Sequence, residues 1–373
     1  MKNIVNLGNV ATYINGYAFK PSDWAEDGTP IIRIQDLTGN SYQMNRFKGI
    51  VDSKYNVNSG DVLISWSASL GVYVWNRGNA VLNQHIFKVV FDKEEVDKDF
   101  FVFQIDNLLK RAANQAHGAT MRHLTKPVFD ALPFYLPDIK TQRLISSKLN
   151  LIVHLIEDHH EQLKKLDELI RSRFLELFGD PNDVSILSLP GEKKSIEDVC
   201  DGIYGGGTPS KSHKEYYTGK IPWVTPKDMK TLSIDDSQNH INSEAIENST
   251  AKLIPKRCVL MVIRSGILKH TLPVAINNVE VTINQDMKAF VPSSLITPEY
   301  LLYTFKLMEK SILSKVRGVT ADNIEFSEFR KRRIVVPPIE VQTQFVDFAL
   351  SIDKSKYREA IFLYLLEDVL HML

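Results

Sequence analysis

The sequence contains a tandem duplication, and this feature limits the possible fold more than any other. From Asp97 and from Thr297 onwards, two stretches align at a constant separation of 200 positions. Upstream the separation drifts, as loops of unequal length would cause, but matched residues continue in the same order. The matched pairs are Gly118–Gly318, Thr120–Thr320, Phe129–Phe329, Pro137–Pro337, Ile139–Ile339, Gln142–Gln342, Asn83–Asn284, Gln84–Gln285 and Asp36–Asp228. The chain therefore predicts two copies of one domain, each followed by a helix.

Each copy has the pattern of a mixed domain. Short apolar segments come first, "PIIRI", "DVLISW" and "IFKVVF" in one copy and "IPWV" and "CVLMVI" in the other, and they predict strands. The stretches "FFVFQIDNLLKRAANQ" and "YLLYTFKLMEKSILSKV" predict helices that end near the paired glycines. We therefore predict an α+β fold with short-stranded sheets. The expected parts are domains at 1–138 and 181–338 and long helices at 139–180 and 339–373.

The two long helices carry heptad repeats. No proline or glycine interrupts Thr141–Phe178, and Gly179-Asp180-Pro181 predicts a sharp stop. Apolar residues recur every seven positions in two registers, which is the pattern of a coiled-coil seam. The predicted seam consists of Leu149, Ile152, Ile156, His159, Leu163, Leu166, Ile170 and Leu177, then Phe345, Ile352, Glu359, Leu363, Leu366 and Leu370. At 1.5 Å per residue the first helix would be ~57 Å long.

We expect these helices to pack antiparallel, with the two domains at opposite ends and related by a pseudo-twofold axis. In such a pair, equivalent residues near the middle meet each other. His159 and Glu359 should therefore be in contact, with Lys356 close by. A polar layer in an apolar seam would fix the register at some cost in stability. The alternative is two separate amphipathic helices, each packed on its own domain.

Composition narrows the classes of function. Lys and Arg number 45, as do Asp and Glu, so the net charge is zero and bulk attraction to nucleic acid is not expected. Any binding of DNA would depend on local basic patches. No apolar stretch approaches the length of a membrane span, and we expect a cytoplasmic protein without membrane contact. Cys200 and Cys258 lack the clustered partners of a metal site, so neither a metal nor a disulfide is expected.

A glycine-rich stretch, "YGGGTPSKSH" at 204–213, resembles a phosphate-binding loop. That motif needs a glycine directly before the lysine, but Ser210 precedes Lys211. Pro209 also removes one backbone amide that such a cradle would use. The segment therefore predicts a surface loop that approaches a ligand closely. An enzyme that binds a nucleotide with Gly205–Ser212 remains an alternative.

Longer segments resemble the specificity (S) subunit of type I restriction–modification systems. They are "GGGTPSKSHKEYYTGKIPWVTPKDM" at 205–229, "TINQDM" at 282–287, and the partners "FYLPDIKTQRLI" and "IVVPPIEVQTQF". The resemblance covers essentially the whole chain. The first domain departs from it, because "NGYAFKPSDWAEDGTPIIRIQDL" stands where the second has the full glycine–proline run.

This resemblance implies a DNA-recognition protein without catalytic residues or a cofactor of its own. Its two target-recognition domains would read a bipartite, asymmetric site in double-stranded DNA. The chain would position two methyltransferase subunits and, through them, restriction subunits. S-adenosylmethionine and ATP would be bound by those partner subunits.

Basic and polar side chains near the loops are the candidates for DNA contact. Basic residues flank the paired Gly-Ala-Thr and Gly-Val-Thr segments in both copies, and these would bind phosphates. Loop side chains would read bases. The candidates are Tyr17, Lys20, Arg33, Arg122, Lys126, Thr208, Ser210, Lys211, His213, Lys214, Lys227, Arg264, Lys269, Lys315 and Arg317.

Three alternatives remain open at this point. Arg33 is either a reader of bases or a strand residue in an ion pair. Asn83-Gln84 and Asn284-Gln285 can bond adenine, but their presence in both copies favours a structural turn, since domains of different specificity should differ in their readers. Besides the nucleotide-binding enzyme, a coiled-coil scaffold without a DNA role would also fit the helices.

Overall fold

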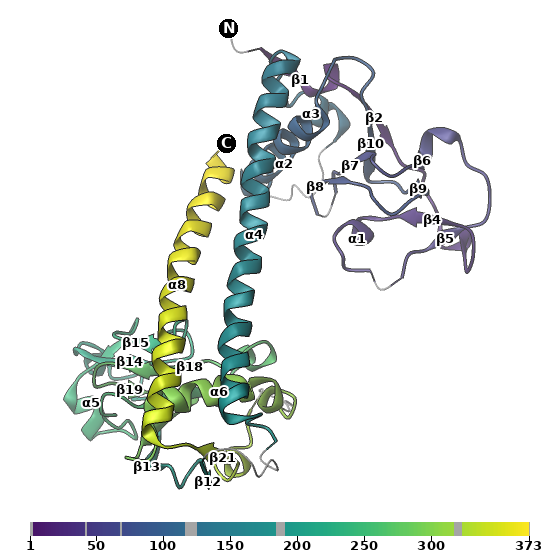
Figure 1. Cartoon of the computed structure of the whole chain (residues 1–373). Coiled ribbons are helices and arrows are strands. Elements are labelled where there is room, and N and C mark those ends of the chain that lie inside the picture. The colour runs from purple at the N-terminus through teal and green to yellow at the C-terminus, as the bar shows by residue number, and fades with distance from the viewer. Residues whose placement is uncertain are drawn as a thin grey trace. The chain divides into compact units, whose positions relative to one another are not determined.

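The computed structural model describes residues 3–41, 43–67, 69–115, 125–183, 191–316 and 323–372 (Figure 1). The chain divides into two compact units. The first comprises Met1–Asp158 with Leu363–Leu373, and the second comprises His159–Phe362. Two long helices, α4 (Ile139–Phe178) and α8 (Ile339–Met372), each contribute one part to each unit.

The first unit is built around an antiparallel sheet of four strands in the order β2-β10-β7-β8. Beside it, β4 runs parallel to β9. The strands are β1 (Ile4–Asn6), β2 (Thr12–Asn15), β3 (Trp24–Ala25), β4 (Thr29–Ile32), β5 (Arg46–Phe47), β6 (Asn56–Val57), β7 (Val62–Ser65), β8 (Gly71–Val74), β9 (Ala80–Leu82), β10 (Ile86–Val90) and β11 (Pro133–Tyr135). The shorter helices are α1 (Ile34–Leu37), α2 (Lys98–Gln115) and α3 (Lys126–Asp130).

The second unit repeats this plan. Its main sheet has the order β13-β20-β17-β18-β15, and β14 runs parallel to β19. The strands are β12 (Glu192–Ser195), β13 (Cys200–Gly205), β14 (Ile221–Val224), β15 (Ser233–Ile234), β16 (His240–Ile241), β17 (Val259–Val262), β18 (Val274–Asn277), β19 (Thr282–Ile283), β20 (Met287–Pro292) and β21 (Arg333–Val336). The shorter helices are α5 (Ser243–Glu247), α6 (Pro298–Leu313) and α7 (Phe326–Phe329). The predicted duplication and the α+β fold are confirmed.

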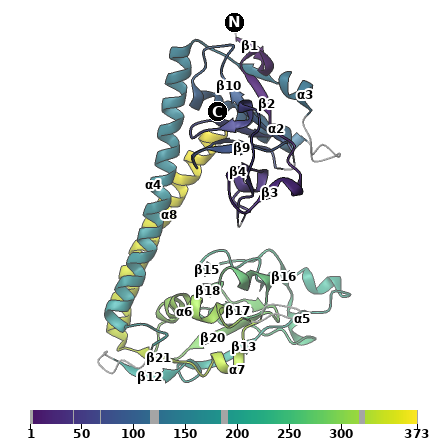
Figure 2. The ribbon, with the colours of Figure 1, turned by 90° about the vertical axis from the view of Figure 1, so that its right-hand side faces the viewer.

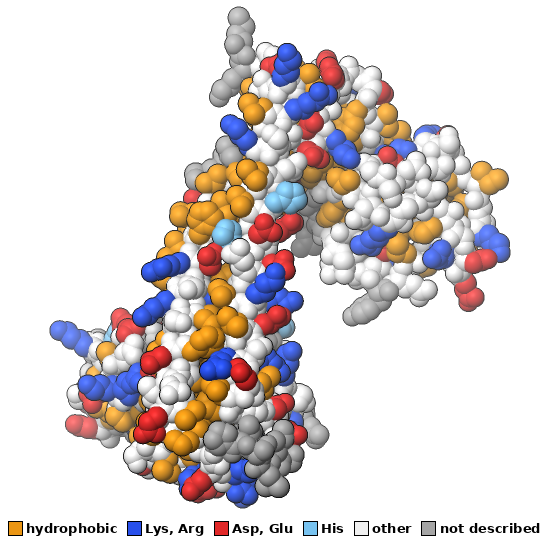
Figure 3. Space-filling view, in the orientation of Figure 1, with side chains coloured by type: hydrophobic (Ala, Val, Ile, Leu, Met, Phe, Trp, Pro, Cys, Tyr) orange, Lys and Arg blue, Asp and Glu red, His pale blue; other side chains and the backbone are white. Residues whose placement is uncertain are grey.

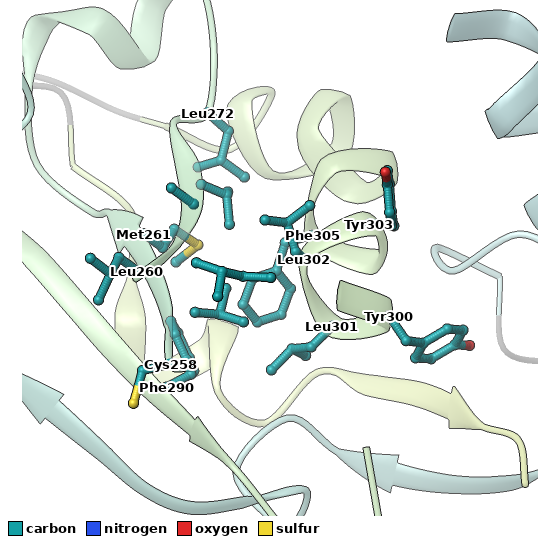
Figure 4. Close-up of a cluster of buried hydrophobic side chains, with 14 of the residues drawn as sticks. Cys258, Leu260, Met261, Leu272, Phe290, Tyr300, Leu301, Leu302, Tyr303 and Phe305 are labelled. Atoms are coloured by element: carbon teal, nitrogen blue, oxygen red, sulfur yellow. The ribbon is translucent and has the colours of Figure 1, made fainter. Parts of the chain in front are cut away.

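Helix α6 has two buried faces. One packs on β17 and β18, where Leu301 and Phe305 face the side chains of Leu260 and Met261 (Figures 2 and 4). On another face, the ring of Tyr300 stacks on Phe174 of α4 with the ring centroids 5.5 Å apart. The helix is therefore apolar on more than one side, and it connects the sheet of this unit to the long helices.

A buried glutamine ties the start of each long helix to its domain. Gln342 is fully buried, and its Nε2 donates to the carbonyl oxygens of Pro337 at 2.8 Å and Leu295 at 2.9 Å. Its Oε1 accepts a hydrogen bond from the amide of Thr297, the residue before α6, at 2.9 Å. Gln142 makes the same bonds to Pro137, Glu95 and Asp97. Because both polar atoms of the amide are hydrogen-bonded, these bonds offset the cost of removing the side chain from water.

The two long helices pack antiparallel within the second unit. The rings of Phe174 on α4 and Phe345 on α8 lie 5.3 Å apart, and towards the other end of this pair Asp167 bonds Lys356. The alternative of two separate helices is therefore wrong. Helix α4 ends at Phe178, as predicted, because Gly179 adopts the left-handed conformation with φ of +73°. Every residue of the predicted seam is buried or partly buried.

The predicted contact between His159 and Glu359 is confirmed. The Nδ1 atom of His159 lies 2.6 Å from Oε2 of Glu359, and the side chains are 16% and 31% exposed. Lys356 lies on the same helix but forms a separate polar contact, to Asp167 at 2.6 Å and Asp353 at 3.3 Å. Burial would lower the pKa of Lys356, but these two carboxylates outweigh that effect and raise it.

Replacing Gln342 with alanine should lower the melting temperature by about 5–10 °C. The change removes three hydrogen bonds and opens a cavity, which together cost about 2–3 kcal/mol. Gln344→Ala is the matched control, because Gln344 lies two residues further along α8 and is exposed. Calorimetry of both variants measures the difference. Equal shifts in the two variants would contradict the role of the buried amide.

Replacing His159 and Glu359 together with leucine should raise the melting temperature by about 2–4 °C. A partly buried polar pair costs desolvation that two leucines in a seam do not. His154→Leu with Glu157→Leu serves as control, because that pair on α4 is exposed. A lower melting temperature for the seam variant, measured in the same calorimeter, would show that the polar pair is stabilising instead.

Candidate nucleic-acid interface

Several loops of the second unit meet at one end of its main sheet. Gly205, the last residue of β13, pairs with Lys288 of β20, and Val262, the last residue of β17, pairs with Met287. Because these strands are antiparallel, the loops after β13 and β17 and the turn before β20 lie at the same edge. This edge, formed by residues 206–213, 263–273 and 284–286, is called the loop edge below.

The glycines of the loop edge allow backbone segments to approach each other closely. A Cβ atom on Gly206 would lie 2.0 Å from the carbonyl oxygen of Asn284, and one on Gly207 would lie 2.3 Å from the amide of Ala251. The amide of Gly207 already donates to Ile283 at 2.9 Å. In the first repeat, a Cβ atom on Gly16 would meet the carbonyl oxygen of Asn83 at the same 2.0 Å.

This geometry does not support the nucleotide-binding alternative. A phosphate cradle needs unpaired amides at the start of a helix. The chain after the glycines instead enters a short 3-10 turn, Lys214–Tyr217, and a helix does not follow directly. The glycines are therefore explained by packing.

The remaining side chains of this loop are mostly exposed. The hydroxyl of Thr208 bonds the side chain of Gln285. The hydroxyls of Ser210 and Ser212 lie 2.7 Å apart. The predicted contacts Lys211, His213 and Lys214 are exposed, and Nδ1 of His213 lies 2.8 Å from a carboxylate oxygen of Glu215.

The turn before β20 has two neighbouring amide side chains, of which one is buried and hydrogen-bonded and the other is exposed. Asn284 is 7% exposed, and its Nδ2 donates to Oδ2 of Asp286 at 3.0 Å. Its Oδ1 accepts from the backbone amide of Asp286 at 3.2 Å. These bonds favour the structural turn over adenine reading for Asn284. Gln285 beside it is exposed.

Arg264 lies at the same edge and is held by Asp286. Its Nε donates to Oδ1 of Asp286 at 2.7 Å, and its side chain is 47% exposed. The aspartate was not among the sequence candidates. The signal was present in "TINQDM", where an acid follows the repeated Asn-Gln while the first copy has His85.

Exposed lysines flank a hollow beside the loop edge. The hollow has a volume of about 660 Å³ and is lined by Lys227, Lys230, Lys306 and Ile267, among others. Lys227 is exposed, and so is Lys269 on the neighbouring 3-10 turn Gly266–Lys269. Lys315 lines a second hollow of about 460 Å³ near the end of α6. Lysines therefore gather around the first hollow although the chain is neutral, whereas Lys315 and Arg332 line the second together with Glu325 and Glu328.

In the first repeat the predicted DNA-contact residues differ in exposure and in their contacts. Tyr17 is 41% exposed, and its ring lies 4.8 Å from that of Phe19. Lys20 is exposed, and Lys126 pairs with Asp130 at 2.7 Å while half-exposed. Arg122 and Arg317 lie outside the described residues.

Arg33 is mainly buried, which favours its role as a residue in an ion pair. Its side chain is 17% exposed, and its Nε lies 3.5 Å from Oδ2 of Asp36.

Among the described residues, buried side-chain atoms without a hydrogen-bond partner all belong to the first repeat. They are Arg33 Nε, Asp36 Oδ1, Asn45 Nδ2, Asn83 Oδ1 and His85 Nδ1.

Within the described ranges, no group of three or more His, Cys, Asp or Glu side chains could hold a metal ion. The same part of the chain contains no helix long and apolar enough to cross a bilayer.

The duplicated domains and the two long helices define a class of protein with two tandem α+β domains, each followed by a long helix. The model of the type I restriction modification DNA specificity domain matches residues 2–168 and again 190–358. The chain belongs to this family.

Curated relatives and solved structures agree with this assignment. The Escherichia coli type I restriction enzyme EcoR124I/EcoR124II specificity subunit is 39% identical over 39% of this chain, but the match spans only 36% of that relative's length. The EcoBI specificity subunit of the same organism is 21% identical over 92% of this chain and 77% of the relative. A structure from a study of the assembly and conformational transition of a type I restriction–modification system has a TM-score of 0.64, with 18% identity, 99% of this chain covered and 95% of the other. The type I S subunit from M. genitalium has a TM-score of 0.55, with 13% identity over 100% of this chain and 94% of that structure.

Gly206→Ala should lower the melting temperature by several degrees, because the added methyl group clashes with backbone that has no room to move. Overpacking of this kind costs about 1–3 kcal/mol. Gly266→Ala is the control, since a Cβ atom there meets nothing within 4 Å. If Gly206→Ala instead keeps the melting temperature and abolishes a saturable binding of nucleotide, the loop is a cradle after all.

Proposed function

We propose that this chain is the DNA sequence-recognition subunit of a type I restriction–modification complex. Residues 1–138 and 181–338 would be the two target-recognition domains, and each would read one half of a bipartite, asymmetric site. The helices at 139–180 and 339–373 would connect them. The observation that carries the proposal is a repeated scaffold with different polar side chains at the same positions.

That observation is clearest after the parallel strands β4 and β14. Asp228 is fully paired: Oδ2 accepts from the amide and hydroxyl of Thr225, each at 2.8 Å, and Oδ1 accepts from the amide of Gln238 at 2.9 Å. The equivalent Asp36 accepts the amide of Arg33 at 2.9 Å, but its other oxygen is unpaired. The backbone turn is preserved, while Arg33 stands where the second repeat has Thr225. Polar side chains at equivalent positions therefore differ, as expected of two readers of different sequences.

The basic residues around the loop edge suit contact with phosphates. The exposed side chains of Lys211, Lys214 and Lys227 lie on loops, where a duplex can approach them. Because the net charge is zero, affinity would come from these local groups and would fall steeply as salt is added.

The long helices also offer a surface for partner subunits. Within the second unit, helix α8 exposes Leu350, Tyr357 and Ile361, whose spacing places them on one side of the helix. Tyr357 is 70% exposed. Figure 3 shows hydrophobic side chains at the surface along the long helices. Large apolar side chains that are exposed in a row mark a surface for protein contact. We assign it to helices of the methyltransferase subunits.

Catalysis would belong to those partners. The methyltransferase subunits would bind S-adenosylmethionine, and the restriction subunits that join through them would bind ATP. The role of this chain would be recognition and positioning without a reaction of its own.

The test is purification of the chain co-expressed with the methyltransferase encoded beside it, followed by sequencing of methylated sites. The expected motif has two specific halves separated by a fixed gap. Replacing residues 195–335 with the same region of a relative should change one half of this motif, because each repeat folds around its own core. Changes in both halves would contradict the modular reading, and a chain that binds no DNA would favour the scaffold alternative.

A further inference from the structure

Two arginines lie at opposite ends of the same strand, and only one of them is at the loop edge. Arg257 precedes β17 and pairs with Glu299, and Arg264 follows β17 and pairs with Asp286. Their side chains are 49% and 47% exposed. They therefore match in residue type, exposure and pairing and differ in position.

A chain of hydrogen bonds orients Arg264. The buried Asn284 donates to Oδ2 of Asp286 at 3.0 Å, and Oδ1 of Asp286 accepts from Nε of Arg264 at 2.7 Å. The backbone amide of Arg264 also donates to the carbonyl oxygen of Asp286 at 3.2 Å. The guanidinium is thus held before any ligand arrives, which reduces the entropy lost on binding.

The bond to Asp286 engages Nε. Within the described part of the chain, this bond leaves the two terminal amino groups of the half-exposed Arg264 available to donate to a ligand. Two parallel N–H donors match the O6 and N7 acceptors of guanine in the major groove, and adenine offers a donor where guanine has O6.

We propose that Arg264 reads a guanine in the half-site bound by the second repeat and that Asp286 is the residue that positions it. This inference rests on the proposed function and names one specificity determinant within it. The effect of a bidentate contact of this type is discrimination of about 10–100-fold against other base pairs.

The first repeat cannot read its half-site in the same way. The amide of Ile263 donates to the carbonyl oxygen of Asp286, as the amide of Trp66 does to His85, so Arg264 corresponds to Ser67. Ser67 is 5% exposed and has a short side chain. The same backbone therefore carries an arginine reader in one repeat and none in the other.

The experiment uses the intact complex with its methyltransferase subunits. The motif is found by methylation sequencing, and exchange of residues 195–335 identifies the half that belongs to the second repeat. Competition binding then compares duplexes in which each base pair of that half is replaced in turn.

Arg264→Ala should reduce discrimination at one G·C pair from about 10–100-fold to less than about threefold and leave the other positions unchanged. Arg264→Lys should keep most of the affinity and lose part of the discrimination, because an ammonium group on a flexible stem lacks the rigid planar fork of the guanidinium. Asp286→Asn should reduce it in part. Arg257→Ala, the control, should change nothing.

Three results would overturn the inference: unchanged discrimination in Arg264→Ala, an equal loss of affinity for every duplex, or the same effect from Arg257→Ala. An equal loss would mean that Arg264 binds a phosphate. If the wild-type complex shows no sequence preference in this assay, the proposed function itself fails, so the two failures are distinguishable.

Discussion

The architecture depends on the hydrogen bonds that one buried glutamine at the start of each long helix makes to the backbone of its domain. Gln142 and Gln342 are buried and bond three backbone groups each, one just before the long helix and two in the segment that leads into α2 or α6. A helix of this length needs a fixed direction at its origin, since a small angular error grows along its axis. The repeated glutamine sets this direction in both copies with the same bonds.

Beyond that anchor, the two repeats differ in how they fill equivalent polar positions. In the second, Tyr303 bonds Asp353, which with Asp167 holds Lys356, so α6 and both long helices share one polar network. At the loop edge, Asn284, Asp286 and Arg264 form another. Among the described residues, one oxygen of the buried Asp36 and the amide oxygen of Asn83 have no hydrogen-bond partner, whereas both oxygens of Asp228 and the amide oxygen of Asn284 accept hydrogen bonds. Duplication thus preserved the backbone and left the polar chemistry free to diverge.

The sequence predicted those features of the structure that follow from heptad spacing and from the internal repeat. The heptad repeats indicated α4 and α8, and the repeat offset of 200 predicted the contact between His159 and Glu359. The patterns did not predict the pair Arg264–Asp286, because sheet register, and not local sequence, brings these residues together across 22 positions. The burial of Arg33 also depends on tertiary packing. Its strand-like sequence context therefore did not decide whether it reads bases or forms an ion pair.

In the proposed function, two separate readers are joined by a helical spacer, and the length of the helices sets the gap in the recognised DNA. The test adds one heptad to α4 and one to α8 at facing positions beside His159 and Glu359, which keeps the seam in register. Each helix grows by ~10 Å, the length of about three base pairs. Sequencing of methylated DNA should find both halves of the motif unchanged, separated by a gap about three base pairs longer, and no methylation at the original spacing. An unchanged gap would mean that the helices do not set the distance.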